Sequence, residues 1–499
     1  MGQLDGARAA VSAWKNSIVV FALALLSMAH VGSPDTFFTG VAGPYPVRVT
    51  VRLPGVIPGL AQISVRIPGS SPGEIRRVTV RAIQWNLGPE GAPPADVATA
   101  VPGDPELHAA DLWLMVATSY RVVVTVEGQA GSGAATVPVM ALATAQREMP
   151  RGLGFVLAGL GIFLGVGLLT IVGAAVRESV VPPGETPDPA RRRRARITVA
   201  IMTALLILAV VGGRAWWNSE AAAYAQSVLF RPFANDVTTR ENGASRILTL
   251  TIRDSRWPPQ GNAVTRYNAL MPDHGKLMHM FLVREDLAGF AHLHPVPRST
   301  SAETFDVVLP ALPSGRYRVY GDIVHESGYA QTLVGSVALG NPLGTSTDAD
   351  ADDSWFLGQA PPEDATATSA ATEGMTITWK RGDPIVAGRE RVLTFVATNA
   401  DGAPAALEPY MGMLGHAAVT NTDGSVFAHL HPAGSISMAA LRKFQGADPH
   451  AEHGVSSGKN EVSIPYAFPK PGRYRLWIQM KRAGQVTTGA FDLDVKPAE

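Results

Sequence analysis

The chain has 499 residues, and its 42 lysines and arginines balance 42 aspartates and glutamates, so its formal net charge is zero. This balance gives no reason to expect a nucleic-acid partner. The chain contains no cysteine, which excludes disulfides, thiolate metal sites and cysteine nucleophiles. Any bound metal must therefore be held by nitrogen, oxygen or thioether ligands.

Residues 1–31 are predicted to be a signal peptide or a first transmembrane helix, because a short apolar run at 18–31 follows two basic residues. Both interpretations remain open and both imply export. Cleavage after Ala29 would leave His30 as the first residue. Its terminal amine and imidazole would then form a chelating pair for cupric copper.

Residues 32–150 are predicted to form a first extracytoplasmic β-sandwich. Short alternating stretches rich in β-branched residues are separated by proline and glycine turns, as is typical of antiparallel sandwiches. The predicted strands lie at 46–53, 62–67, 77–83, 112–117 and 120–126.

Residues 151–215 are predicted to form a transmembrane hairpin. Its apolar stretches at 153–176 and 197–213 are about long enough to cross roughly 30 Å of hydrocarbon. The connection between them carries five arginines, and basic residues in short loops stay on the cytoplasmic side; they are Arg191, Arg192, Arg193, Arg194 and Arg196. We therefore expect a cell-membrane protein in contact with the lipid bilayer, with its soluble domains on the extracytoplasmic, periplasmic side.

Residues 240–340 and 375–499 are predicted to be two copies of one β-domain, joined by an acidic flexible linker at 341–374. The hexapeptide Phe-Ala-His-Leu-His-Pro occurs at 290–295 and again at 427–432, and a tandem repeat of this kind indicates duplication. The predicted fold is mainly β: three immunoglobulin-like antiparallel β-sandwiches attached to two or three transmembrane helices.

The duplicated histidines are predicted to bind metal. In the last domain an Asp423-Gly424 turn of type I′ would place His416 opposite His431, with His429 on the same face of the sheet. The first copy has the same spacing, so the two predicted triads are His279, His292 and His294, and His416, His429 and His431. Further candidate ligands nearby are His274, Met278, Met280, Met411 and Met413.

Imidazole with thioether suits copper, whereas imidazoles alone suit zinc or cupric copper. Copper is therefore the favoured ion and zinc the alternative. The same histidines could instead be structural, with hydrogen bonds to main-chain carbonyls and methionine as core filler. His325, His450 and His453 are weaker candidates. We do not expect an enzyme, because the outer domains carry no hydrolase elbow, phosphate loop or zinc-protease helix.

The last domain combines Leu-Glu-Pro-Tyr-Met-Gly at 407–412, Gly-His at 415–416, the hexapeptide, and Phe-Pro-Lys-Pro-Gly-Arg-Tyr-Arg-Leu-Trp at 468–477. This combination resembles the YtkA-like group of bacterial envelope domains. The resemblance is close over 375–495 and looser over 245–339. It implies exported immunoglobulin-type sandwiches, with metal-handling or respiratory-complex assembly proteins as partners.

The sequence therefore predicts a membrane-anchored protein that binds or hands on a transition metal through the histidines of two β-domains. The alternative prediction is a structural, docking or adhesion module of an envelope membrane complex, in which the histidines bind no metal.

Overall fold

The computed structural model describes residues 35–182, 184–257, 265–299, 302–343, 350–360, 368–370, 374–446 and 459–498. The predicted leader 1–31, with His30, lies outside these residues, as do His450 and His453. The described chain is mainly β, with its strands in antiparallel sheets. It divides into two compact units: residues 143–230, and the β-domains on either side of them.

The first β-domain is an eight-stranded antiparallel sheet with the order β1-β2-β3-β6-β5-β4-β7-β8. Its strands are β1 Thr36–Ala42, β2 Tyr45–Arg52, β3 Gly59–Arg66, β4 Ile75–Gln84, β5 Asp96–Val101, β6 Asp104–Leu114, β7 Ser119–Gly128 and β8 Gly131–Met140. Alternate residues are buried, for example Val122, Val124 and Val126 on β7, as the strand period requires. The predicted strand at 112–117 is shifted, because β6 ends at Leu114 and Met115 and Val116 are exposed.

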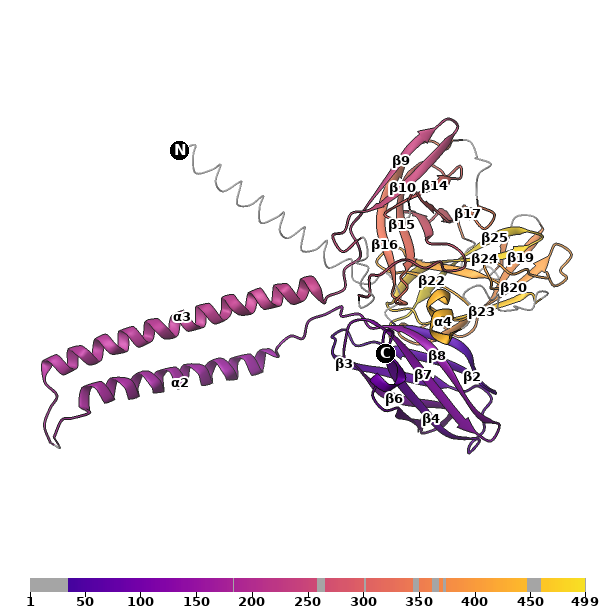
Figure 1. Ribbon diagram of the computed structural model, residues 1–499. Helices are drawn as coiled ribbons and strands as arrows, with labels where there is room; N and C mark the ends of the chain where they lie inside the picture. The colour runs from indigo at the N-terminus through magenta and orange to yellow at the C-terminus, as the bar shows by residue number, and fades with distance from the viewer. Residues whose placement is uncertain are drawn as a thin grey trace. The chain divides into compact units, whose positions relative to one another are not determined.

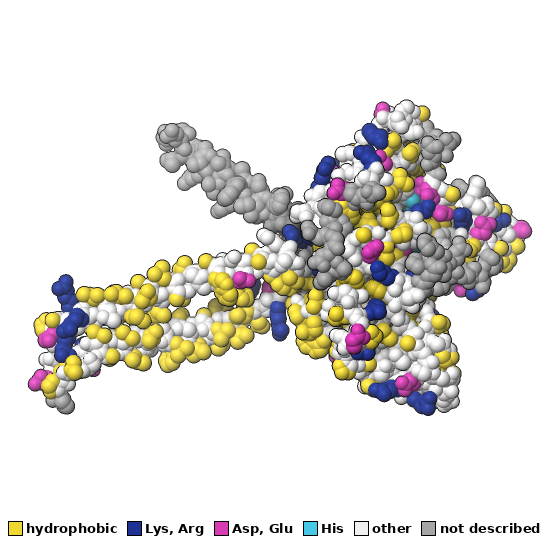
Figure 2. Space-filling model, viewed as in Figure 1, with side chains coloured by type: hydrophobic (Ala, Val, Ile, Leu, Met, Phe, Trp, Pro, Cys, Tyr) yellow, Lys and Arg dark blue, Asp and Glu magenta, His cyan; other side chains and the backbone are white. Residues whose placement is uncertain are grey.

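Two long helices, α2 Arg151–Glu178 and α3 Pro189–Ser227, make up the second unit. They run side by side (Figure 1), and hydrophobic side chains cover their visible faces while basic side chains gather at their connection (Figure 2). Both helices are long and apolar enough to cross a membrane. Asp188 caps α3 by accepting a 2.7 Å hydrogen bond from the Arg191 main chain. The helix continues past the predicted end at residue 213.

The second β-domain packs two antiparallel sheets against each other. One has the order β13-β14-β10-β9 and the other β16-β15-β11-β12-β17. The strands are β9 Asn235–Asn242, β10 Ser245–Ile252, β11 His279–Arg284, β12 Gly289–Leu293, β13 Val296–Pro297, β14 Thr304–Leu309, β15 Gly315–Val324, β16 Ala330–Leu339 and β17 Ser354–Leu357. A hydrophobic core that includes Leu248, Leu282 and Phe305 joins the two sheets.

The third β-domain repeats this plan with sheets β18-β19-β20-β23 and β22-β21-β24-β25. Its elements are β18 Thr368–Ala370, β19 Met375–Lys380, β20 Arg391–Asn399, β21 His416–Asn421, β22 Phe427–Leu430, helix α4 Met438–Gln445, β23 Glu461–Tyr466, β24 Gly472–Arg482 and β25 Gln485–Val495. Helix α4 has no counterpart among the described residues of the second domain and lies in the segment that makes this copy longer.

Part of the predicted flexible linker is ordered. Within 341–374, Ser354–Leu357 forms β17, which pairs with β12 from Gly289↔Leu357 to His292↔Ser354. The acidic composition suggested a solvated connection, but it does not prevent a short edge strand from completing the sheet that carries the histidines. This difference places the neighbouring aspartates beside those histidines.

The two homologous domains meet through equivalent residues. Phe290 of the second domain stacks on Trp477 of the third, with ring centroids 4.6 Å apart and an 11° angle between planes. Tyr320 stacks in the same way on Phe427, at 4.0 Å and 5°. Phe290 corresponds to Phe427 in the duplication and Tyr320 to Trp477. The interface is therefore pseudo-twofold, like that of an isologous homodimer fused into one chain.

Replacing Trp477 with alanine should weaken this interface, because the side chain is fully buried and stacked. A buried tryptophan truncated to alanine costs about 3–5 kcal/mol, whereas Trp477→Phe keeps an aromatic ring against Phe290 and should cost less. Thermal unfolding of the full chain in detergent would measure both variants. Equal midpoints for the wild type and Trp477→Ala would contradict the stacked interface.

Candidate metal centre

Side chains alternate between the two faces of a β-strand, and this alternation points the histidines toward the domain interface. On β11, Phe281 belongs to the hydrophobic cluster between the domains, and His279 shares its strand face. Met278 and Met280 have the opposite parity and lie in the core of the second domain. These two methionines therefore lie on the other side of the sheet from His279.

His279, His292 and His294 form the first group. One nitrogen from each lies within 4.8 Å of the others, and all three side chains are buried. Nε2 of His279 lies 3.1 Å from the main-chain oxygen of Asp273. Nδ1 of His292 lies 2.9 Å from Oε1 of Gln479.

The third imidazole is oriented in the same way. Nδ1 of His294 lies 2.9 Å from Oδ1 of Asp353, and its Nε2 is buried without a hydrogen bond to any described residue. In each of the three rings, one nitrogen lies within hydrogen-bond distance of an oxygen acceptor, so that nitrogen carries the hydrogen and donates it. The other nitrogen of each ring then presents a lone pair.

Two of these lone pairs face each other. Nδ1 of His279 and Nε2 of His292 are 3.1 Å apart. Two nitrogens bound at about 2.0–2.1 Å to one tetrahedral ion would be separated by roughly 3.3 Å. With both outer nitrogens acting as donors, both inner nitrogens present lone pairs to each other, and their spacing suits a shared ion.

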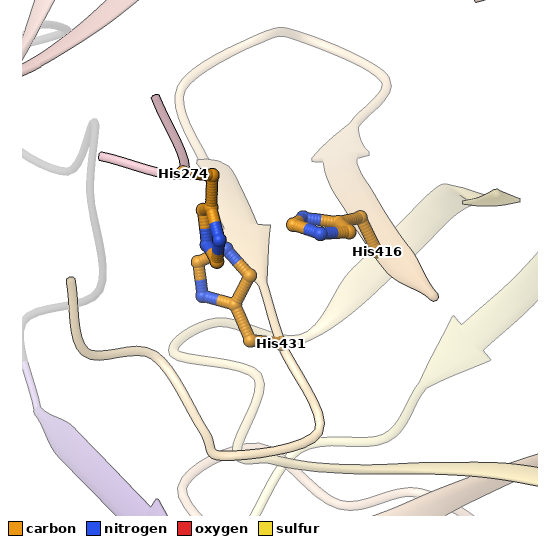
Figure 3. Close-up of side chains that lie close together, drawn as sticks. All are labelled: His274, His416 and His431. Carbon is orange, nitrogen blue, oxygen red and sulfur yellow. The ribbon is translucent and has the colours of Figure 1, made fainter. Parts of the chain in front are cut away.

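The second group joins the two domains. His274 from the second domain points toward His416 and His431 of the third (Figure 3), and one nitrogen from each lies within 4.8 Å of the others. Both ring nitrogens of His274 and both of His431 are buried without a hydrogen bond of ordinary geometry to any residue that the structure describes. The main chains of Met411 and Ile436 lie close enough to favour the charged forms of these two rings, but not in hydrogen-bonding geometry.

His416 and His429 reproduce the first pair. Nδ1 of His416 lies 3.2 Å from Nε2 of His429, and Nε2 of His416 lies 3.2 Å from the Tyr410 main-chain oxygen. The outer nitrogen of His429 is 3.4 Å from Oδ2 of Asp322. The predicted triad of His416, His429 and His431 is thus brought together as neighbouring rings, but His274 takes the place of His429 in the three-nitrogen group.

The predicted register of the third domain is confirmed, because Ala418 pairs with His429 and Ala417 with Leu430. The predicted type I′ turn is wrong. Gly424 has a φ of 72°, but Asp423 does not have positive φ. Its carboxylate instead accepts a 2.7 Å hydrogen bond from the Ser425 main chain, which stabilises a different turn with the same register.

Burial favours the neutral form of five imidazoles of the centre. Loss of solvation lowers the pKa of His279, His292, His416 and His429 well below the usual value, and neighbouring imidazoles lower it further. Burial, with the nearby His274, lowers the pKa of His431 to about 3. Neutral imidazole is the form that coordinates metal.

Residues that the sequence did not single out complete the surroundings. Gln479 and Asp322 occupy equivalent positions, opposite His416 on β24 and opposite His279 on β15. Gln479 of the third domain contacts His292 of the second, and Asp322 of the second contacts His429 of the third. The two contacts across the interface are therefore reciprocal. Their register positions follow from the duplication, but the crossing depends on domain packing that the sequence does not display.

Three aspartates just before β17 contact residues in or near this centre. Asp353 accepts hydrogen bonds from both the main chain and the ring of His294. Asp350 forms an ion pair with Lys276, and Asp352 forms one with Lys481 at 3.0 Å. The predicted linker therefore contributes a carboxylate that orients a candidate ligand.

The remaining candidates are two buried methionines and His325. Met411 and Met413 are buried, with 9% and 6% of their surfaces exposed. His325 lies outside the centre: its Nδ1 is 2.6 Å from the Asn268 main-chain oxygen, and its Nε2 accepts from Gln331 at 3.0 Å. His325 thus has the hydrogen-bond partners expected of a structural histidine.

Residues 236–336 and 369–497 match the family model described as "Domain of unknown function (DUF8832)". These segments coincide with the second and third β-domains. No curated protein matches the sequence. The resemblance to YtkA-like domains stays a prediction.

Solved structures align only weakly. One is the tetra-tandem repeat of the extending region of a large adhesion protein, with 10% identity over 89% of this chain and 72% of that chain, at a TM-score of 0.16. Another is a putative membrane-anchored protein from Corynebacterium diphtheriae, with 9% identity over 93% and 97% and a TM-score of 0.15. Escherichia coli alpha-2-macroglobulin aligns at 9% identity over 94% of this chain and 23% of that chain, with a TM-score of 0.20. At these scores the likenesses carry no argument.

His325 should make stability depend on pH. Burial lowers its pKa from 6.5 to about 4, so the unfolded chain takes up a proton below pH 6.5 while the folded domain does not. The stabilisation is complete above pH 6.5 and is lost as the pH falls toward 4, amounting to about 2 kcal/mol between pH 7 and 5. Denaturant unfolding of the wild type and His325→Gln at both pH values would measure it. An equal loss in both proteins would contradict this role.

Proposed function

We propose that the protein is a membrane-anchored transition-metal-binding protein, with copper favoured and zinc the alternative, and that its ion is held by histidines between the two homologous β-domains. The observation that supports this best is the convergence of His279, His292 and His294. Each ring has its outer nitrogen beside an oxygen acceptor; the inner nitrogens of His279 and His292 face each other, and that of His294 has no hydrogen bond to a described residue. Hydrogen-bond partners of metal-bound histidines impose this arrangement on the rings.

A shared proton is the competing explanation for the facing nitrogens of His279 and His292. It would create an imidazolium in a fully buried site, where desolvation and neighbouring histidines lower the pKa of both rings. A metal ion instead accepts both lone pairs and a third from His294 at the same time. Coordination therefore suits this site better than protonation.

The membrane arrangement in this proposal rests on α2 and α3, which are both apolar enough to span a bilayer. With the arginine-rich connection on the cytoplasmic side, the β-domains before and after the hairpin lie on the extracytoplasmic side. The resemblance to YtkA-like domains supports metal-handling or respiratory-complex assembly proteins as partners. The protein would then hold an ion close to the membrane for transfer.

Full-length protein in detergent should retain copper or zinc after incubation with the metal and dialysis. His279→Ala combined with His292→Ala should lose ions, because it removes two of the three converging nitrogens. Elemental analysis and titration with cupric, cuprous and zinc ions would measure this. A matched control is His108→Gln, which changes a buried histidine of the first β-domain.

Loss of metal in the double variant, with retention in His108→Gln and unchanged circular dichroism in both, supports the proposal. No metal retained by the wild type from micromolar solutions would overturn it. The histidines would then be structural, and a docking or adhesion module would be the better interpretation.

Asp353→Asn should weaken metal binding by about 10–100-fold, the usual cost of altering a hydrogen-bonded partner of a ligand. The substitution keeps an oxygen beside His294 but removes the charged acceptor that orients the ring. Asp352→Asn is the control, because Asp352 pairs with Lys481 instead of a histidine. Equal affinities of the two variants would rule out this role for Asp353.

A further inference from the structure

His274 and Met411 occupy equivalent positions in the duplication, each five residues before the first histidine of its copy, His279 or His416. Both have positive φ, 53° and 49°, and each is followed by a glycine with a φ of 82° or 78°. Positive φ is uncommon for residues with side chains. The two loops therefore share an unusual backbone geometry as well as a sequence position.

His274 crosses from its own domain to His416 and His431 of the other. The interface is reciprocal in its other contacts, since His292 meets Gln479 while His429 meets Asp322. His274 lies beside the histidines of the third domain. The pseudo-twofold symmetry of the interface therefore places Met411 beside the histidines of the second domain. The Met411 main chain also lies beside the His274 ring, which is the close approach that this symmetry requires.

We propose that the centre holds two ions at unequal positions, each completed by a residue of the other domain. This inference rests on the proposed function. At one position His279, His292 and His294 are joined by the thioether of Met411. At the other, His274, His416 and His431 supply three imidazoles.

The second position has support of its own. Four ring nitrogens, two on His274 and two on His431, are buried without a hydrogen bond of ordinary geometry to described residues, although Nε2 of His274 lies 3.8 Å from Oδ1 of Asp273. Buried polar atoms left in this state are costly, and coordination would satisfy one nitrogen of each ring. Ring centroids of His274 lie 5.1 Å from His416 and 5.4 Å from His431, so the three rings surround a common space.

The two positions differ in chemistry. Thioether is a soft ligand that favours cuprous copper, whereas imidazoles alone accept zinc or cupric copper. We therefore expect the Met411 position to select cuprous copper and the His274 position to bind zinc. The centre as a whole would bind two ions per chain.

The test uses the full chain in detergent, loaded anaerobically with cuprous copper alone or aerobically with zinc alone. We expect X-ray absorption of the cuprous protein to show a sulfur neighbour that disappears in Met411→Leu, a substitution of similar volume. Met413→Leu is the matched control, because it removes a buried thioether two residues away, and it should keep the sulfur signal. With zinc alone, His274→Ala should lose the zinc ion bound at the His274 position.

The outcomes separate this inference from the proposed function. If the wild type binds neither metal, the proposed function fails and the inference fails with it. If it binds one ion and His274→Ala leaves that number unchanged, the two-ion centre is refuted while metal binding stands. A sulfur signal that persists in Met411→Leu overturns the assignment of Met411.

Discussion

The face-to-face packing of two copies of one sheet governs the rest of this structure. The reciprocal stacks of Phe290 on Trp477 and of Tyr320 on Phe427 bring together surfaces that, in an isolated copy, would expose aromatic rings beside a histidine triad. Exposed apolar patches of this kind mark interaction surfaces. Here the partner is the other copy, so the interaction is internal and the histidines are withdrawn from water.

That withdrawal determines what the histidines can do. An imidazole in water can carry a proton, but burial lowers the pKa of His279 and His416 well below its ordinary value. The acceptors that replace water, including Gln479 and Asp353, satisfy only the outer nitrogens. The interior therefore contains neutral donors with unshared electron pairs and little solvent. Coordination of a cation is the chemistry that satisfies such a site without restoring water.

The sequence predicts the local part of this centre and misses the part that depends on domain packing. Strand alternation and register place His429 opposite Ala418, and these follow from the spacing within one hairpin. The same alternation should have excluded Met280, whose parity differs from that of His279. The crossing of His274 and the role of Asp353 depend on the packing of the two copies and on an edge strand inside an acidic segment, which no local pattern encodes.

Fusion of the two copies in one chain explains how the two proposed positions come to differ. In a symmetric homodimer, each crossing residue is the same on both sides, and the two sites must be chemically alike. In this chain the equivalent positions hold His274 and Met411, although the backbone around them is conserved in conformation. Duplication thus keeps the shared interface and its orienting acceptors while each crossing ligand changes independently. The fused chain can therefore combine one position that has a thioether ligand with one that has only imidazoles, whereas a symmetric dimer cannot.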